Sequence, residues 1–226
     1  GGDGIWGDWF TGRIDEVRIY DRALDGAEVD ADMESPIQTP KSGPVAAWSF
    51  DEGEGETAED LTGDGHTATI HGAQWTTHGR YGDALEFDGA EEDYVSVPAS
   101  EELDQTEEFT VEAWVRPTEA TSLATILMKE REGGEPHYSW ALKQHGETAR
   151  GYLMEEEGPE GEEGSLPLRT WTHLALTDDG AHTRLYVDGE LVATGAAIPV
   201  EGDGELRMGG DGIWGDWFTG RIDEVR

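Results

Sequence analysis

The sequence carries one segment twice, and this repetition constrains the fold more than any other feature. GGDGIWGDWFTGRIDEVR occupies residues 1–18 and recurs without a change at residues 209–226. Self-similarity with both copies at the ends predicts that the chain begins near the end of one repeat and stops near the end of the next. Residues 1–34 are therefore expected to be the C-terminal end of a preceding identical repeat. They would contain its final strand and a short helical turn that opens at Asp25 or Gly26 and ends before Pro36.

A proline-containing stretch separates this segment from the rest of the chain. Residues 35–44 (SPIQTPKSGP) hold three prolines and no periodic apolar pattern, which predicts a semi-rigid linker. A complete domain is expected to follow at residues 45–226.

Short apolar runs with turn residues between them fill residues 45–226, and no long helical pattern interrupts them. Strands are predicted at 45–50, 67–72, 84–87, 93–97, 109–116, 124–129, 137–143, 149–154, 170–177, 182–187, 190–195, 205–208 and 221–226. VDGE at 187–190 contains an Asp-Gly hairpin signal, and EEEGPEGEEG at 155–164 indicates a solvated acidic loop. The pattern predicts an all-β fold, a two-sheet antiparallel β-sandwich.

The longer runs resemble the laminin-G-like domains of the concanavalin A-like lectin/glucanase superfamily, in the form found in bacterial and archaeal surface proteins. The resemblance lies in residues 45–75, 79–98, 109–117, 171–195 and 220–226, and GRIDEVRIYDRAL at 12–24 matches the complete family ending. It implies a jelly roll and binding or adhesion rather than catalysis, in an extracellular or cell-surface location, usually with structural calcium. The core residues that it implies are Trp48, Phe50, Phe87, Trp114, Trp171, Leu174, Leu185 and Val187.

Calcium would bind in the acidic, glycine-rich loop after the first strand of the domain. Calcium takes six to eight oxygen ligands from carboxylates and carbonyls, and this loop supplies both. Asp51 and Asp60 are the candidate carboxylates, with a carbonyl from Thr62 or Gly63. The resemblance adds an acidic residue of the last strand, which is Asp223 here. In so acidic a chain, the alternative is a solvated acidic face without a metal.

One stretch has the E-x-D-x-x-E spacing of β-glucan hydrolases that share this superfold. Glu102, Asp104 and Glu107 form it. Retaining glycoside hydrolysis needs two carboxyl groups about 5–5.5 Å apart, usually presented by a strand. Here the motif lies in a polar turn before the strand at 109–116, so the spacing is read as a coincidence and no catalytic residue is assigned.

Two tryptophans stand in the glycine-rich loop GGDGIWGDWFTG, where large aromatics are unusual. Trp214 and Trp217, together with Trp140, are candidates to stack on sugar rings or to anchor a partner protein. The alternative is that they fold down onto the edge of the sandwich, more so Trp217 than Trp214, with Phe218 in the core.

The net charge of −36, from 51 acidic and 15 basic residues, excludes nucleic acid and anionic lipid as partners at ordinary salt. At about 1 M salt the screening length falls to about 3 Å, so this composition suits a halophilic setting as well as plain solubility. No apolar stretch reaches the roughly 20 residues of a membrane span. The absence of cysteine excludes disulfides, so stability must come from the core and from bound ions.

Two functional hypotheses follow. The first is a calcium-stabilised structural or adhesive repeat of a surface protein or filament, and the second is a carbohydrate-binding module that uses the loop aromatics. Because one sandwich has one position for the GRIDEVRIY strand and the chain carries two copies, a spare strand with Ile14, Val17 and Ile19 is expected to dock into a neighbouring copy. The alternative is that residues 1–24 fold back into their own sandwich and displace the C-terminal copy.

Overall fold

The structure is a computed structural model of the chain. It describes residues 9–20, 22–34, 43–89, 93–104, 108–132, 137–153, 156–157, 160–161, 164–197, 202–214 and 216–224. For residues 9–17, 156–157 and 160–161 it describes the backbone alone. No helix in these ranges has the length and apolar character needed to cross a membrane.

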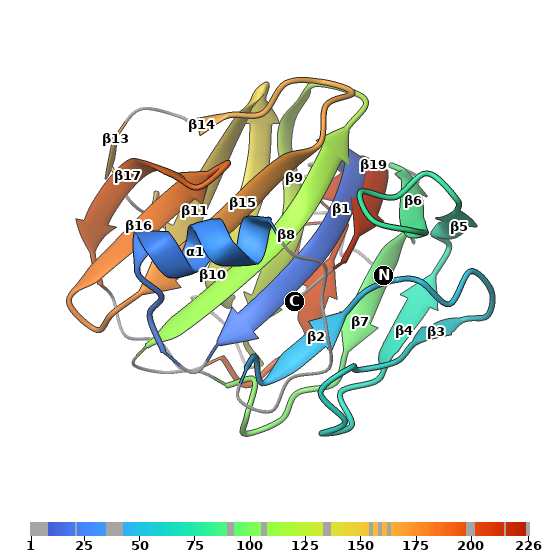
Figure 1. Ribbon diagram of the computed structural model, residues 1–226, viewed down its shortest axis with the longest axis horizontal. Helices are drawn as coiled ribbons and strands as arrows, with labels where there is room; N and C mark the ends of the chain where they lie inside the picture. Colours follow the sequence, from blue (N-terminus) through green and yellow to red (C-terminus); the bar gives the residue numbers. More distant parts are fainter. Residues whose placement is uncertain are drawn as a thin grey trace.

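Two sheets stack face to face, which confirms the predicted β-sandwich (Figure 1). The first sheet has the order β13 (Glu160–Gly161), β17 (Glu190–Ala196), β16 (His182–Val187), β15 (Thr172–Asp178), β8 (Phe109–Pro117), β1 (Trp9–Tyr20), β19 (Trp217–Asp223), β6 (Ala84–Asp88) and β5 (Gln74–Thr76), with β2 (Ala46–Trp48) on β1. The second has the order β12 (Glu156–Glu157), β11 (Thr148–Leu153), β10 (Tyr138–Gly146), β9 (Thr121–Glu130), β18 (Leu206–Met208), β7 (Tyr94–Val97), β4 (Ala68–His71) and β3 (Thr57–Ala58), with β14 (Gly164–Ser165) on β11.

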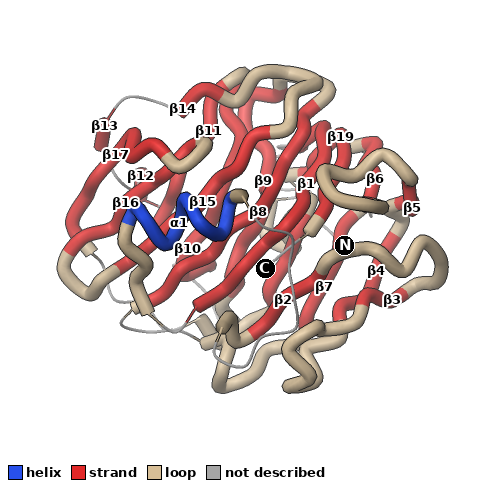
Figure 2. The backbone as a smooth tube through the Cα atoms, in the orientation of Figure 1, coloured by secondary structure: helices blue, strands red, loops and turns tan. Residues whose placement is uncertain are grey.

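Strands account for most of the described chain, and their positions follow the sequence pattern closely (Figure 2). The prediction of a solvated loop over the whole of 155–164 was wrong, because this stretch contains the two-residue strands β12 and β13, which pair with β11 and β17. Both lie at an outer edge of a sheet. Charged residues suit such edges, since they discourage pairing with further chains. The predicted hairpin is confirmed: Asp188 (φ 49°) and Gly189 (φ 78°) have the left-handed conformation that a tight two-residue turn requires between β16 and β17.

The core lies between the sheets and contains most of the side chains that were expected there. Trp48, Phe50, Phe87, Leu174, Leu185, Val187 and Phe218 belong to it. Two expectations were wrong. Trp171 is only partly buried. Trp114 is buried but faces outward, because alternation along β8 gives Val111, Ala113 and Val115 to the core and leaves Glu112 and Trp114 on the opposite face.

Helix α1 (Gly26–Met33) packs across the outer face of the first sheet (Figure 1). Its start is set by a capping box in which the Asp25 side chain accepts from the Glu28 N–H and Glu28 reaches back to Asp25. Its buried Val29 packs in an apolar cluster that links the N-terminal segment to β15 and β16. The cluster contains Tyr20, Leu24, Val29, Ala175 and Tyr186. In this chain the segment is thus part of the sandwich. Its origin in a preceding repeat stays a prediction.

The two copies of the repeated sequence lie in the same sheet. β1 and β19 pair in parallel, and each residue from Trp9 to Asp15 lies opposite its own counterpart from Trp217 to Asp223. The other described strand pairs are antiparallel. The N-terminal copy therefore lies in its own sandwich, as the fold-back alternative expected. It does not displace the C-terminal copy, so the expectations of displacement and of an unpaired spare strand were both wrong.

Candidate functional site

The described part of the glycine-rich loop, residues 209–214, brings Ile213 and Trp214 onto the outer face of the second sheet. It follows β18, and it is tied to β9 by the bonds from Gly209 N to Ile126 O (2.9 Å) and from Thr125 N to Asp216 O (3.0 Å). Gly209 (φ 78°) lies so close to Phe87, and Gly210 so close to Trp217, that a side chain at either position would collide with the ring. These glycines let the loop lie flat over core aromatics, which brings Ile213 and Trp214 onto the strands below.

A buried polar cluster anchors this loop. Lys143 of β10 is 2% exposed, and its Nζ contacts the carboxylate of Asp216 and lies 3.7 Å from Asp211 Oδ2. Asp211 also accepts from Thr125 Oγ1 (2.7 Å) and from the backbone N–H of Trp214 (2.6 Å). Because a buried charge is stable only when paired and hydrogen-bonded, this network fixes the loop and the backbone of Trp214.

Trp214 is the large aromatic that this arrangement leaves partly exposed. The edges of two rings hold its indole, with centroids 5.6 Å away for His137 and 5.4 Å for Tyr138. Lys143 Nζ lies 5.0 Å from the ring centroid, within the range of a cation–π contact. The Trp214 indole is therefore held in one orientation above the charged Lys143 and its carboxylate partners.

Charged side chains lie next to the loop. Arg207 of β18 pairs with Glu205 (2.8 Å) and lies 3.5 Å from Glu130 of β9. Arg207 also packs over the ring of Tyr94. Glu130 Oε1 accepts from Gly212 N, and Arg207 also lies near Gly212, two residues before Trp214, so an aromatic surface and hydrogen-bonding groups share one region of the protein.

The other two candidate aromatics are not available to a ligand, which corrects the expectation from sequence. Trp140 is 3% exposed and stacks on Phe109 in the core, and Trp217 is 1% exposed. Alternation along β10 places Trp140 inward, and the course of the loop places Trp217 under its own glycines. Of the three, only Trp214 keeps an accessible face.

The five candidate calcium ligands do not form one centre. Asp60 is buried and accepts from Ala47 N, Thr62 N and Oγ1, and His66 N, so its two oxygens already serve the loop. Within the described residues, no group of three or more acidic or histidine side chains is placed to hold a metal. As the loop stands, the named set does not fit a single ion, and calcium remains a prediction.

Of the remaining candidates, Gly63 N donates to Asp60 O (3.3 Å), while Asp51 and Asp223 bind a different segment. Asp51 is exposed and accepts from Asp83 N (2.9 Å), and partial burial, followed by the charge of Asp83, raises the pKa of Asp51. Asp223 is fully buried in β19, and its Oδ2 accepts from Arg80 N and Tyr81 N. Gly63 is exposed. Asp51 and Asp223 both hold the segment at 80–83, which gives them a structural role independent of any ion.

The described part of the enzyme-like stretch begins in a turn at residues 101–103, as expected. Glu102 is exposed, and the Asp104 carboxylate pairs with Lys129 Nζ at 2.6 Å. Burial lowers the pKa of Lys129, while Asp104 opposes this effect. Glu107 lies outside the described residues.

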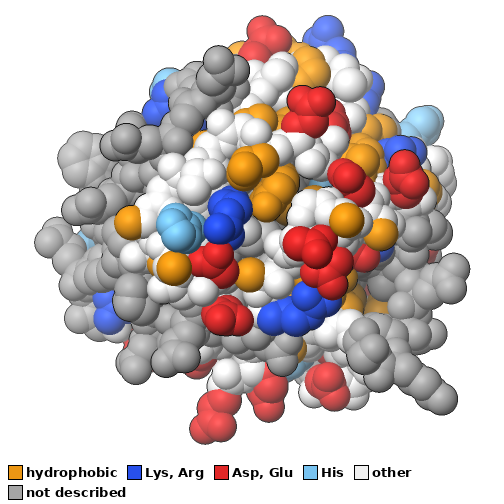
Figure 3. All heavy atoms as spheres, turned by 60° about the vertical axis from the view of Figure 1, so that its left-hand side comes forward, with side chains coloured by type: hydrophobic (Ala, Val, Ile, Leu, Met, Phe, Trp, Pro, Cys, Tyr) orange, Lys and Arg blue, Asp and Glu red, His pale blue; other side chains and the backbone are white. Residues whose placement is uncertain are grey.

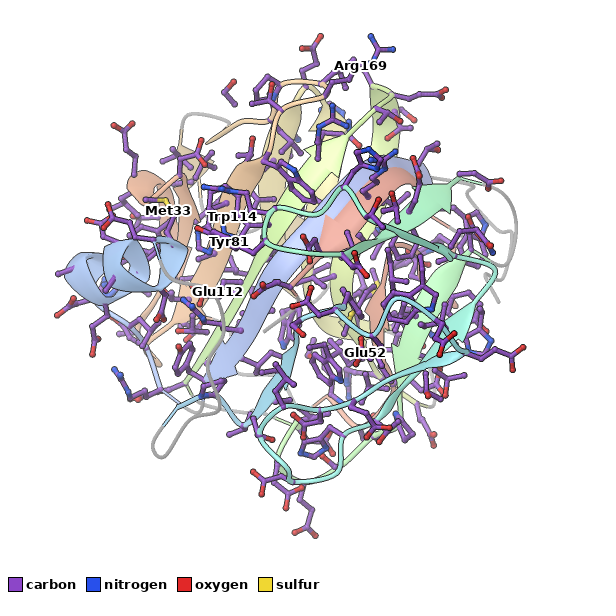
Figure 4. The ribbon with its side chains drawn as sticks, turned by 45° about the vertical axis from the view of Figure 1, so that its right-hand side comes forward. Met33, Glu52, Tyr81, Glu112, Trp114 and Arg169 are labelled. Carbon is purple, nitrogen blue, oxygen red and sulfur yellow. The ribbon has the colours of Figure 1, made fainter. Side chains whose placement is uncertain are left out.

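A second buried polar cluster, which the sequence analysis missed, lies between α1 and the outer face of the first sheet. Glu112 is fully buried, 3.3 Å from Arg18 Nη1 and 3.6 Å from His173 Nε2, and Arg18 also pairs with Asp32 at 2.9 Å. Figure 4 shows Glu112 near Trp114, Tyr81 and Met33. The Tyr81 hydroxyl donates to Met33 O (3.4 Å), and Arg80 lies 4.2 Å from the Trp114 ring. A polar residue inside the run FTVEAWV was the available signal.

Burial controls the protonation of this cluster. It raises the pKa of Glu112 to about 8, although Arg18 opposes the rise. Burial also lowers the pKa of His173 to about 3, and Arg18 and Arg80 lower it further. Both groups are therefore neutral near pH 7, and Arg18 is balanced mainly by Asp32.

Of the candidate strand-docking residues, Ile19 is 2% exposed and packs in the core of its own sandwich. The backbone of Ile14 and Val17 lies in β1, while their side chains lie outside the described set. The strand that was expected to dock into a neighbouring copy pairs here with β8 of its own chain.

Comparison with known proteins gives a family-level match. The family model of the Concanavalin A-like lectin/glucanases superfamily matches residues 88–226. No curated protein matches the chain in sequence.

Solved structures share the fold at low identity. Domain 4 of an extracellular arabinanase from Geobacillus stearothermophilus, in complex with arabinotriose, aligns with a TM-score of 0.55 and 20% identity, over 79% of this chain and 88% of that domain. A mutant Trypanosoma rangeli sialidase aligns with a TM-score of 0.63 and 18% identity, over 88% of this chain and 34% of that one. The ligand-binding domain of botulinum neurotoxin serotype D, in complex with N-acetylneuraminic acid, gives a TM-score of 0.55 and 14% identity, over 73% of this chain and 42% of that one.

The chain thus spans less than half of the sialidase and toxin structures, and nearly all of the arabinanase domain. At these identities the likeness is one of fold.

Proposed function

Because the chain belongs to the concanavalin A-like lectin/glucanase superfamily, we propose that it is a non-catalytic binding domain that recognises a glycan through Trp214. The observation that carries this proposal is the partly exposed indole, held by His137 and Tyr138 above the buried Lys143 cluster. A binding site gains affinity when its contact groups are fixed before the ligand arrives. Trp214 meets that condition.

Two structural neighbours support a glycan as the ligand class. The arabinanase domain was solved with arabinotriose and the toxin domain with N-acetylneuraminic acid. The arabinanase domain is the more informative comparison, because the present chain covers 88% of it. It is one domain of a larger arabinanase.

The negative charge of the protein favours a neutral oligosaccharide over an acidic one as the ligand. A protein with a net charge of −36 repels acidic sugars at ordinary salt. On the face shown in Figure 3, acidic side chains are interspersed with basic and apolar ones. Lys143 is neutralised by Asp211 and Asp216, so it offers no free positive charge to an anionic ligand. Arg207, Glu130 and Glu205 supply donors and acceptors suited to hydroxyl groups.

The absence of catalysis is part of the proposal. In the described residues, Glu102 and Asp104 lie in a turn, and Asp104 is engaged by Lys129. A retaining pair needs two free carboxyl groups about 5–5.5 Å apart across the scissile bond. Among the described residues of this stretch, Glu102 and Asp104 do not form such a pair, because Asp104 is engaged by Lys129.

Adhesion at a cell surface, a high-salt setting and stabilisation by calcium complete the proposal. The acidic composition and the resemblance of residues 45–226 to surface-protein domains support them. Glycan recognition and adhesion are compatible, since a repeated sandwich with one weak sugar site gains strength from several copies in one array.

A glycan array, followed by titration of the bound sugar, tests the proposal. We expect a neutral oligosaccharide to bind the wild-type chain and Trp214→Ala to lose about 2 kcal/mol, which is roughly thirtyfold in Kd. Trp75→Ala is the matched control, because Trp75 is also partly exposed but lies in β5 at the edge of the first sheet. The same sugars should release no reducing ends. Binding that survives Trp214→Ala, or an array without any hit, contradicts the proposed site.

A further inference from the structure

Three arginine side chains gather at one end of the first sheet, although the chain has only 15 basic residues against 51 acidic ones. Arg116 of β8 lies opposite Arg221 of β19 in the strand register, so the two side chains lie on the same face of the sheet. Alternation along β8 makes this the outer face, which also carries Trp114. We define Arg116, Arg169 and Arg221 as the arginine cluster.

Arg169 joins the cluster from the turn before β15. Its backbone N–H donates to Pro117 O (2.6 Å), next to Arg116, and Figure 4 shows Arg169 at one end of the sandwich. The residue has the left-handed backbone conformation (φ 59°), which glycine and asparagine adopt more readily than arginine. Residues held in that conformation are common at functional sites. Arginine at this position therefore has a conformational cost that glycine would avoid.

The charges of the cluster are not balanced. Among the described residues, Glu86 of β6 pairs with Arg221 Nε at 2.8 Å, whereas Arg116 and Arg169 take part in no ion pair. Partial burial lowers the pKa of Arg116, the charge of Arg169 lowers it further, and Glu86 opposes both effects. Because arginine stays protonated in proteins, three guanidinium groups beside one carboxylate leave a local excess of positive charge.

One guanidinium nitrogen of the cluster has a proton to donate. Within the described residues, Arg221 Nη1 is buried and makes no hydrogen bond. A buried donor without an acceptor is unfavourable, and such a group calls for a bound ion or water. Where positive charge is in excess, an oxyanion is the acceptor that gains most. The planar fork of a guanidinium group matches a carboxylate or a tetrahedral oxyanion through two parallel hydrogen bonds.

We infer that the arginine cluster is a binding site for an oxyanion, a carboxylate or sulfate group, which Arg116, Arg169 and Arg221 hold together. The site lies on the outer face of the first sheet, whereas Trp214 lies on the outer face of the second, so the two sites are separate. The net charge of −36 repels anions at low salt, but at about 1 M salt the screening length is only about 3 Å. Local charges then decide binding, and here they are positive.

Arginine side-chain resonances test the inference. The Nε–H groups are followed in ¹H–¹⁵N spectra while the chloride of a high-salt buffer is replaced stepwise by sulfate at constant ionic strength. The resonances of Arg116, Arg169 and Arg221 should shift and saturate together with one dissociation constant. The resonance of Arg22, an exposed arginine that pairs with Glu28 at 3.0 Å, should show no saturable shift. Shifts that grow linearly in all four arginines overturn the site.

Matched variants separate binding from the general stabilisation that sulfate gives to folded proteins. Arg116→Gln and Arg169→Gln should each weaken sulfate binding about tenfold, because each removes a charged hydrogen-bond donor. Arg22→Gln removes the same charge from an exposed ion pair elsewhere, so it should leave the dissociation constant unchanged. Equal sulfate affinity in all three variants overturns the inference.

Melting temperatures of the same variants should show a reversal. In chloride alone, Arg169→Gln relieves the repulsion on Arg116, so its Tm should equal or exceed that of the wild type. In saturating sulfate the wild type should melt at the higher temperature, because a ligand stabilises the folded state that binds it. A Tm difference between the two proteins that does not change with sulfate contradicts the inference.

Glucuronic acid and glucose identify what carries the oxyanion. Glucuronate presents a carboxylate on a sugar ring, and glucose is its neutral counterpart. Sulfate binding with glucuronate binding shows that the site accepts a saccharide-borne group, and sulfate binding alone shows that it takes free inorganic anions. Glucose that shifts the three arginine resonances as much as glucuronate does would refute recognition of the charge. The inference does not depend on glycan binding at Trp214, which is unchanged in all of these variants.

Discussion

Glu112→Gln should change how stability depends on pH, because Glu112 is a fully buried carboxyl group beneath α1. Burial raises its pKa from 4.5 to about 8, while Arg18 at 3.3 Å opposes the rise. Glutamine has nearly the same shape as the protonated acid but does not titrate. The variant therefore removes the titration and keeps most of the packing.

The sign follows from the direction of the shift. Between pH 4.5 and about 8 the unfolded chain has lost the Glu112 proton, whereas the folded chain keeps it. Stability from this group is fully present below pH 4.5 and falls by about 1.36 kcal/mol per pH unit as the pH rises through that window. Between pH 4.5 and about 8, the difference in free energy of unfolding between Glu112→Gln and the wild type should therefore change by about 4–5 kcal/mol.

His173 acts in the opposite direction below its ordinary pKa of 6.5. Burial lowers its folded pKa to about 3, so its contribution is present above pH 6.5 and is lost as the pH falls. From these two groups together, the free energy of unfolding of the wild type should be nearly constant from pH 4.5 to 6.5 and should fall from pH 6.5 to 8. The free energy of unfolding of Glu112→Gln should instead rise up to pH 6.5 and stay constant above it.

Urea unfolding at fixed salt, measured at half-unit steps from pH 5 to pH 8, provides the assay. The free energy of unfolding of the variant minus that of the wild type should increase steadily with pH. A difference that stays constant over this range would refute the buried, proton-retaining state of Glu112. If Arg18 dominated over burial, the folded pKa of Glu112 would lie below 4.5, and the difference would change only below pH 4.5.

Two other perturbations address the acidic loop. Asp60→Ala should lower the free energy of unfolding by about 3 kcal/mol, because it leaves the buried N–H groups of Ala47 and His66 without their acceptor. Asp51→Ala, at an exposed position, should lower it by less than about 1 kcal/mol, and equal losses in chemical unfolding would contradict the structural role of Asp60. Removing calcium with a chelator at low salt should lower Tm, and high salt should restore much of the loss by screening the net charge of −36; a melting curve indifferent to the chelator would exclude calcium, and one indifferent to salt would exclude charge repulsion as a cause of instability.

The fold was predictable because local pattern and turn chemistry agree along most of the chain. The alternation in FTVEAWV and the Asp188-Gly189 turn each specify one structure. The two-residue strands β12 and β13 were not predictable, since they depend on backbone pairing at sheet edges and not on any apolar pattern. The outward direction of Trp114 was readable from β8 in retrospect, because Glu112 shares its face.

The candidate site was predictable only in part. The glycine-rich loop pointed to Trp214, but its partners His137 and Lys143 come from β10 and the segment before it, far away in sequence. Nothing in the sequence around Asp211 and Asp216 indicates that Lys143 pairs with them. Such pairings depend on which strands become neighbours, and no local pattern encodes that.

The most direct test of the central claim observes the tryptophan itself. In a ¹⁵N NMR titration with the neutral oligosaccharide found on the array, the indole N–H resonance of Trp214 should move with the ligand concentration. The resonances of Trp140 and Trp217, which are 3% and 1% exposed, should move little. Saturable binding that shifts other resonances and leaves Trp214 in place would contradict the account.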